Sequence, residues 1–71
     1  MTYYASYLAN HSTRNAEPIK STNKKELIRD IRTIAEGETH PGGDCSWVVQ
    51  AEDGGVIAIG GLQNGIRYRS F

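Results

Sequence analysis

Residues 46–70 read SWVVQAEDGGVIAIGGLQNGIRYRS, and this stretch decides the fold. It holds three runs rich in β-branched, aromatic and small apolar residues, separated by dipeptides that suit tight turns, namely Asp53-Gly54 or Gly54-Gly55 and then Asn64-Gly65. A type I′ hairpin turn needs positive φ at both central residues, which these dipeptides tolerate. The stretch therefore predicts a three-stranded antiparallel meander, with strands over residues 46–52, 56–62 and 66–70.

Side chains alternate along a strand, so the two faces of this meander can be assigned from the sequence. One face is expected to carry Trp47, Val49, Ala51, Val56, Ala58, Leu62, Arg67 and Arg69. The other is expected to carry Val48, Gln50, Ile57, Ile59, Ile66 and Tyr68. Both faces hold several large apolar side chains, so both favour burial. The second turn also pairs Gly60 with Arg69, which leaves room for a large neighbour across the ladder.

A single helix is predicted upstream of the meander, over residues 24–36. Asn23 suits the N-cap, with Glu26 three residues later as in a capping box. Gly37 is expected to end the helix in a left-handed conformation. Five apolar residues at helical spacing form a stripe that faces the sheet, and they are Leu27, Ile28, Ile31, Ile34 and Ala35.

The opposite side of this helix is expected to carry a basic ridge formed by Lys25, Arg29 and Arg32. Two interpretations of the ridge stay open. It is either a solvated face with an ion pair between Arg32 and Glu36, or a surface for an anionic partner.

The first strand is predicted over residues 3–8, where Tyr3, Tyr4 and Tyr7 give it two aromatic faces. One face packs on the helix, and the other is available to a partner. Residues 9–22 show little periodicity and are expected to form a long loop. The fold class that follows is α+β, a single two-layer domain of all 71 residues. Its order is β-α-β-β-β, with the helix packed on one face of an antiparallel sheet.

The charge balance excludes several classes of protein. Eight Lys and Arg residues balance eight Asp and Glu residues, so the formal net charge is zero. A non-specific nucleic-acid binder needs a basic excess, and an acidic nucleic-acid mimic needs the opposite. No stretch approaches the roughly 18 apolar residues of a membrane span, and the start of the chain does not read as a signal peptide. The expected compartment is therefore the cytoplasm, with no membrane partner.

The residues that are able to carry chemistry do not form a convincing site. Cys45 is the single cysteine, so an intramolecular disulfide is excluded. With His40 and Asp44 it provides the residue types of a nucleophile, a base and an orienting group, but within a glycine-rich turn that offers no cleft. Together with His11 these residues lack the spacing of a zinc site, and the glycine pairs lack the context of a phosphate loop. No enzyme, metal or cofactor is expected.

The surplus apolar surface points to a partner instead. One helix covers one face of the sheet, so the second face needs a larger protein, a second copy in a homodimer, or the 9–22 loop folded over it. The predicted partner-binding residues are Trp47, Val49, Leu62, Arg67, Arg69, Tyr4, Lys25, Arg29 and Arg32. The alternative exposed set on the other face is Ile57, Ile59, Ile66 and Tyr68.

The other hypothesis is a small nucleic-acid-binding module. It would use the helix ridge and the last strand, through Lys24, Lys25, Arg29, Arg32, Arg67 and Arg69. Arg67 and Arg69 project to the same face as Trp47, which makes a surface that suits single strands or anionic protein patches. The competing interpretation is that the two arginines protect an edge strand from aggregation.

Three stretches together resemble small orphan proteins of bacterial phages and prophages, among them anti-CRISPR and other anti-defence inhibitors. These stretches are the Tyr3-Tyr4-Ala5-Ser6-Tyr7 strand, the single helix over 24–32 and the hairpin over 60–65. Such proteins share no common signature, so no functional residue is carried over. The resemblance implies a non-enzymatic inhibitor that blocks a larger protein such as a defence nuclease, and, since the charge is balanced, one that acts through shape and mixed contacts.

Overall fold

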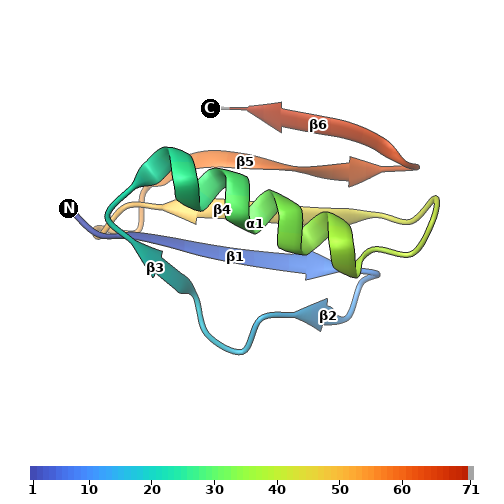
Figure 1. Cartoon of the computed structure of the whole chain (residues 1–71), viewed down its shortest axis with the longest axis horizontal. Coiled ribbons are helices and arrows are strands. Elements are labelled where there is room, and N and C mark those ends of the chain that lie inside the picture. Colours follow the sequence, from blue (N-terminus) through green and yellow to red (C-terminus); the bar gives the residue numbers. More distant parts are fainter. Residues whose placement is uncertain (71) are drawn as a thin grey trace.

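The computed structural model describes residues 1–70, and its single helix lies across one face of an antiparallel sheet (Figure 1). The elements in chain order are β1 (Tyr3–Ala9), β2 (Thr13–Arg14), β3 (Ile19–Ser21), α1 (Lys24–Glu38), β4 (Cys45–Gln50), β5 (Val56–Gln63) and β6 (Ile66–Ser70). The strand order is β2-β1-β4-β5-β6, and β3 pairs with β1 beside β2. This arrangement confirms the predicted α+β domain.

The helix begins as predicted but ends later. Asn23 accepts a hydrogen bond from the backbone N–H of Glu26 at 3.1 Å, which confirms the N-cap. Gly37, however, lies inside the helix, which continues to Glu38. Its last carbonyls are satisfied by side chains, since the Thr39 hydroxyl donates to Ala35 and the Asn10 amide donates to Glu38. A left-handed glycine cap is therefore not needed, and the prediction that Gly37 ends the helix is wrong.

The segment predicted as a loop over 9–22 forms two short strands. Both β2 and β3 pair with the outer edge of β1. Between them the Asn15 side chain takes the place of a strand, because its amide oxygen accepts from the Tyr7 N–H at 3.1 Å and its amide nitrogen donates to the Ala5 carbonyl at 3.2 Å. The segment therefore widens the sheet at its edge and does not fold over either face.

The two hairpins of the meander differ from each other. Asn64 and Gly65 both have positive φ, 54° and 79°, as the predicted type I′ turn requires. The first hairpin has a longer connection, in which the Gly54 N–H donates to the Ala51 carbonyl at 2.9 Å. Neither Asp53 nor Gly55 is among the residues with positive φ, so both predicted two-residue turns, Asp53-Gly54 and Gly54-Gly55, are wrong, and β4 ends at Gln50.

A bulge near this first hairpin changes which face two residues occupy. Val49 pairs with Ala58, but Gln50 pairs with Val56, so Ile57 is the extra residue. The bulge moves Val56 to the side of Gln50, away from Trp47, where it is 59% exposed. Ile57 packs against the buried cluster instead. The alternation rule fails at these two positions because it assumes an unbroken ladder.

The core lies between the helix and the sheet. Its buried members are Ala5, Ala9, Leu27, Ile31, Ala35, Cys45, Trp47, Val49 and Ala58. The sheet contributes mostly small residues, which let the helix approach closely. A Cβ on Gly60 would overlap the indole ring of Trp47, so this glycine provides the space in which the largest core side chain lies.

The candidate interaction surface on the open face of the sheet

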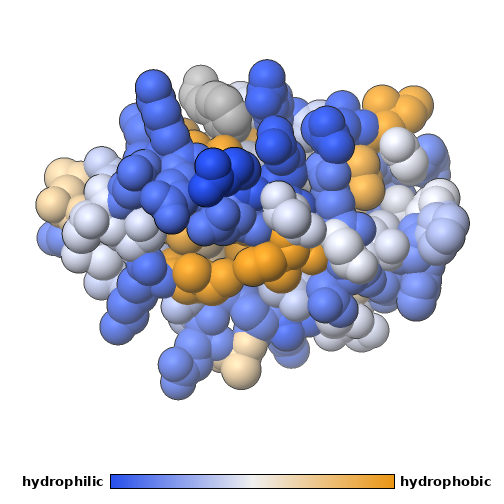
Figure 2. Space-filling model, viewed as in Figure 1, coloured by the Kyte–Doolittle hydropathy of each residue, from blue (hydrophilic) through white to orange (hydrophobic). Residues whose placement is uncertain are grey.

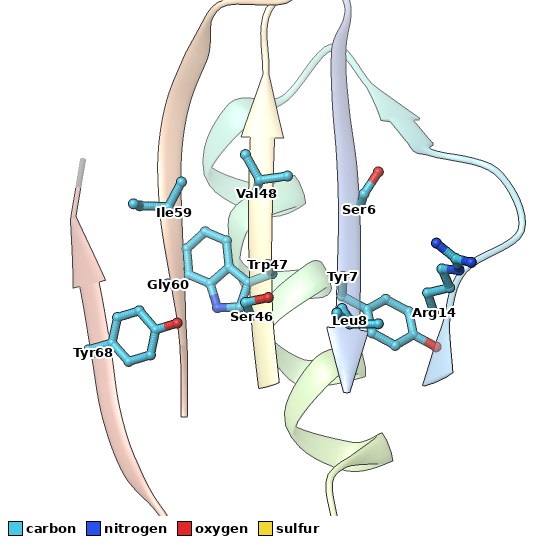
Figure 3. Close-up of a pocket in the computed structure, with 10 residues that line it drawn as sticks. All are labelled: Ser6, Tyr7, Leu8, Arg14, Ser46, Trp47, Val48, Ile59, Gly60 and Tyr68. Carbon is cyan, nitrogen blue, oxygen red and sulfur yellow. The ribbon is translucent and has the colours of Figure 1, made fainter. Parts of the chain in front are cut away.

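The side of the sheet that faces away from α1 carries the candidate site, and we call it the open face (Figure 3). Its large side chains are Tyr4, Leu8, Val48, Val56, Ile59, Ile66 and Tyr68. Five of them are strongly exposed, with exposed fractions of 38% for Leu8, 59% for Val56, 44% for Ile59, 72% for Ile66 and 43% for Tyr68. An uncovered apolar surface of this kind is a candidate binding surface.

The strand register explains the shape of this surface. Leu8, Ser46, Gly61 and Tyr68 lie opposite one another in a row that crosses β1, β4, β5 and β6. The two small residues lie in the middle of the row and the two large ones at its ends. The result is a groove of about 430 Å³, with Val48 and Ile59 also in its lining.

Neighbouring hollows extend the groove. One of about 290 Å³ shares Leu8, Ser46 and Tyr68 with it and continues to Asp44 and His11. Another of about 440 Å³ shares Ser6 and Arg14 with it and continues to Pro18 in the connection between β2 and β3. The depression therefore reaches from the β2 and β3 edge to β6.

Charge is distributed unevenly around the open face. Arg14 lies opposite Leu8 and lines the groove, and Lys20 lies opposite Tyr4 farther along the same edge of β1. The Lys20 ammonium lies 5.9 Å from the centroid of the Tyr4 ring. The described strands hold four cations and no acidic residue, whereas the helix holds four of each sign and the connecting segments hold the other four acids. The sheet is thus the basic part of a neutral chain.

The predicted partner-binding residues of the meander lie mostly on the covered face. Trp47 and Val49 are only 3% and 0% exposed, beneath the helix, so their placement on the exposed face is corrected. Leu62 is half-buried and packs against the same cluster. From the alternative set, Ile59, Ile66 and Tyr68 are the residues that the structure exposes. The helix packs on the face that carries Ala5, Ala58 and Gly60, whose small size leaves room for the helix and for the Trp47 ring.

Arg67 and Arg69 lie on the helix side of the edge strand β6, and Arg67 is bound to the helix. Its guanidinium donates two hydrogen bonds to the Glu36 carboxylate, at 2.9 and 2.8 Å. These bonds, together with the negative charge of Glu36, raise the pKa of Arg67 above its ordinary value. The predicted pair between Arg32 and Glu36 is replaced by this bidentate contact.

The basic helix ridge lies far from the open face. Lys25 and Arg29 are exposed and Arg32 is half-buried, and Arg29 lies 3.6 Å from the Asp30 carboxylate. The view over the helix in Figure 2 is largely hydrophilic, with a narrower apolar strip beside the helix. Of the predicted surface residues, Tyr4 alone lies on the open face, where it is half-buried.

The residues considered for catalysis or metal binding do not converge. Cys45 is 5% exposed in the core, His40 is exposed, and the Asp44 carboxylate accepts from the Asn64 N–H at 2.8 Å. Within residues 1–70, no group of three or more His, Cys, Asp or Glu side chains is placed to hold a metal ion. Over the same residues, no helix is long and apolar enough to cross a membrane.

Sequence reasoning missed several residues of the groove. Arg14 and Lys20 were hidden in the segment predicted as a loop, because a side-chain amide rather than a hydrophobic pattern joins that segment to β1. Leu8 and Ser46 carried a usable signal, since each alternates with a residue that the structure buries. Pairing the first strand beside the meander would have placed both on the open face.

No family model, curated protein or solved structure matches this chain. The resemblance to phage-encoded inhibitors therefore stays a prediction that rests on the residues alone.

Proposed function

We propose that this protein is a non-enzymatic binding protein that attaches to another protein chain through its open face. The observation that carries the proposal is the group of five large apolar side chains, 38–72% exposed, gathered on one side of the sheet. Interfaces are centred on such apolar and aromatic clusters with a polar rim. Ser6, Ser46 and Gln50 supply polar groups between the apolar ones on the same face.

The chain itself does not cover this face. Within the described residues, α1 lies on the opposite side of the sheet and residues 9–22 lie at its edge. The exposed face of a small domain is costly to leave in water, at roughly 25 cal/mol for each Å² of apolar surface. Burial against another chain removes this cost.

Within this proposal the chain acts as a small inhibitor of a larger protein in a bacterial cytoplasm. Blocking requires only that a surface be occupied, so it needs no catalytic group. A nuclease of a bacterial defence system is the target class that the resemblance favours. A homodimer is the other form of binding that this face offers, with a second copy on the same surface.

A photo-crosslinking amino acid at one position on each side of the molecule tests the proposal. Position 59 lies on the open face, and position 29 lies on the outer side of the helix. In cells, we expect crosslinks to a protein from position 59 and none from position 29. Equal crosslinking at both positions, or none at position 59, would contradict the proposal. A crosslink from 59 to a second copy supports protein binding and identifies the homodimer.

A nucleic-acid-binding module is the second candidate, and one observation favours it. All four charged residues in the strands are positive, and the Lys20 ammonium lies 5.9 Å from the centroid of the Tyr4 ring. Arg67, which was predicted to contact nucleic acid, is bound to Glu36 instead. A mobility shift with a single-stranded oligonucleotide at low salt, repeated for Lys20→Glu, tests this candidate. A shift that the variant abolishes favours it, and no shift at low salt removes it.

A further inference from the structure

The groove on the open face has the width of an α-helix. Leu8 on β1 and Tyr68 on β6 lie at the two ends of one row, three strand intervals apart. At about 4.8 Å per interval the row spans about 14 Å. An α-helix with its side chains is about 10–12 Å across, so one helix fits between Leu8 and Tyr68. Ser46, which lines the groove (Figure 3), and its partner Gly61 are the small residues in the middle of the row and leave space for apolar side chains of the helix.

The charge of the strands favours a partner helix over a second copy of the domain. The described strands hold four cations and no acidic side chain, so a second copy placed face to face would bring its own Arg14 and Lys20 and no strand carboxylate. Like charges across an interface are unfavourable, whereas an acidic partner complements these cations.

The charge at the rim selects the chemistry of that helix. Arg14 lines the groove on the β1 side, Lys20 lies farther along the same edge opposite Tyr4, and the strands carry no acidic side chain among residues 1–70. Glu17, in the connection between β2 and β3, lies between these two cations in the chain and reduces their combined charge. Asp44 borders the adjoining hollow, and its carboxylate accepts a hydrogen bond from the backbone N–H of Asn64. The β1 rim therefore retains an excess of positive charge.

From the width and the charge, we infer that the open face binds an acidic amphipathic α-helix of a partner protein. The apolar face of that helix would lie over Val48 and Ile59, and its acidic flank would lie along Arg14 and Lys20. This inference rests on the proposed function and specifies the partner. Bound in this way, the partner helix would complete a three-layer arrangement, with one helix on each face of the sheet.

A pair of synthetic peptides tests the charge and the shape together. Both have leucines at i, i+3, i+4 and i+7, and one carries glutamates along one flank where the other carries lysines. Each is titrated into the isotope-labelled full chain and followed by NMR. We expect at least tenfold tighter binding of the acidic peptide, with shifts at the amides of Leu8, Val48, Ile59 and Tyr68. Equal affinity for the two peptides, or shifts on the helix side, would overturn the inference.

Two charge-reversed variants separate a local effect from net charge. Arg14→Glu combined with Lys20→Glu is expected to reverse the preference, so that the basic peptide binds more tightly. Lys25→Glu combined with Arg29→Glu makes the same change in net charge on the outer side of the helix, and the preference should stay as in the wild type. Loss of the preference in both double variants would mean that only net charge is sensed, against the inference. Glu17→Gln should strengthen acidic-peptide binding, and weaker binding would count against it.

The same experiment distinguishes the other occupants. A dimer by light scattering, with open-face amides that shift on dilution, would assign the groove to a second copy. A uridine oligonucleotide that shifts these amides more strongly than the acidic peptide would assign it to nucleic acid. Either result overturns the inference. The dimer leaves the proposed function standing, whereas the absence of any crosslink from position 59 removes the proposed function itself.

Discussion

The same strands build the covered face and the open face of the sheet, and the two faces differ in burial, because the helix packs on the first and leaves the second exposed. On the covered face Ala5, Ala9 and Ala58 are at most 2% exposed, and Gly60 makes room for Trp47. On the open face Leu8, Ile59 and Tyr68 are 38–44% exposed. The three alanines and Gly60 leave the space that the helix and the indole ring fill, although both faces carry large apolar side chains. Apolar character alone therefore does not decide which face becomes the core.

The largest expected effect comes from filling the space beneath Trp47. In Gly60→Val the new side chain would overlap the indole ring, and its Cβ would lie 2.8 Å from the Tyr68 carbonyl oxygen. Overpacking of this severity costs about 3 kcal/mol or more, a large share of the stability of a small domain. We expect loss of the cooperative urea transition followed by tryptophan fluorescence. A variant with the wild-type midpoint would show that the covered face is not closely packed.

Val48 and Val49 provide a matched pair on one strand, with their side chains on opposite faces. Val49 is 0% exposed and Val48 is half-buried. Val49→Ala leaves a cavity and should lower the free energy of unfolding by roughly 2–3 kcal/mol. Val48→Ala should cost less than half as much, since its site collapses into solvent.

The same two valine variants also test whether a second copy covers the groove in solution. If a second copy occupies the open face in solution, the two valine variants should cost similar amounts and the wild-type midpoint should rise with protein concentration. Urea unfolding at two concentrations separates the cases. A midpoint independent of concentration, with a large difference between Val49→Ala and Val48→Ala, supports an open face.

The sequence predicted the helix, the N-cap and the second hairpin because each depends on residues close in the chain. Asn23 caps the helix by a bond to Glu26, three residues later, and Asn64 forms the turn in which it lies. The features it missed depend on distant partners. The Asn15 side chain forms hydrogen bonds with β1, and Glu36 pairs with Arg67 of β6 instead of with Arg32 of its own helix. Patterns among neighbouring residues do not predict such long-range contacts.

The candidate site was predictable in kind but not in place. A sheet with two apolar faces and a single helix correctly implied that the helix leaves one face uncovered. The choice between the faces depends on how closely the helix can approach, which is set by Gly60 and the alanines on the strands. Trp47 and Ile59 are both large side chains in strands of the meander, and only packing shows that the first is buried and the second exposed.

Arg67 joins the two faces at the edge of the sheet, because its guanidinium holds β6 to the helix while Tyr68 faces the groove. Arg67→Ala removes the contact with Glu36, so we expect the amides of β6 to exchange with deuterium several-fold faster than in the wild type. The global midpoint should change little, since exposed ion pairs contribute little. Lys25→Ala, at an exposed cation on the helix, is the control. Equal exchange at β6 in both variants would show that the ion pair does not hold the strand.

The smallest expected effect is a gain, at the glycine inside the helix. Gly37 is the penultimate residue of α1, and a methyl group on its Cα would meet no atom within 4 Å beyond the adjoining helix backbone. Gly37→Ala lowers the conformational entropy of the unfolded chain and adds no contact, so it should raise the free energy of unfolding by about 0.5–1 kcal/mol. Urea unfolding measures this change in the free energy of unfolding. Gly60→Val, a substitution at a glycine whose surroundings are filled, is the contrasting variant. If Gly37→Ala destabilised the chain instead, the helix would end at Gly37 as the sequence alone suggested, and the cap at Thr39 would be wrong.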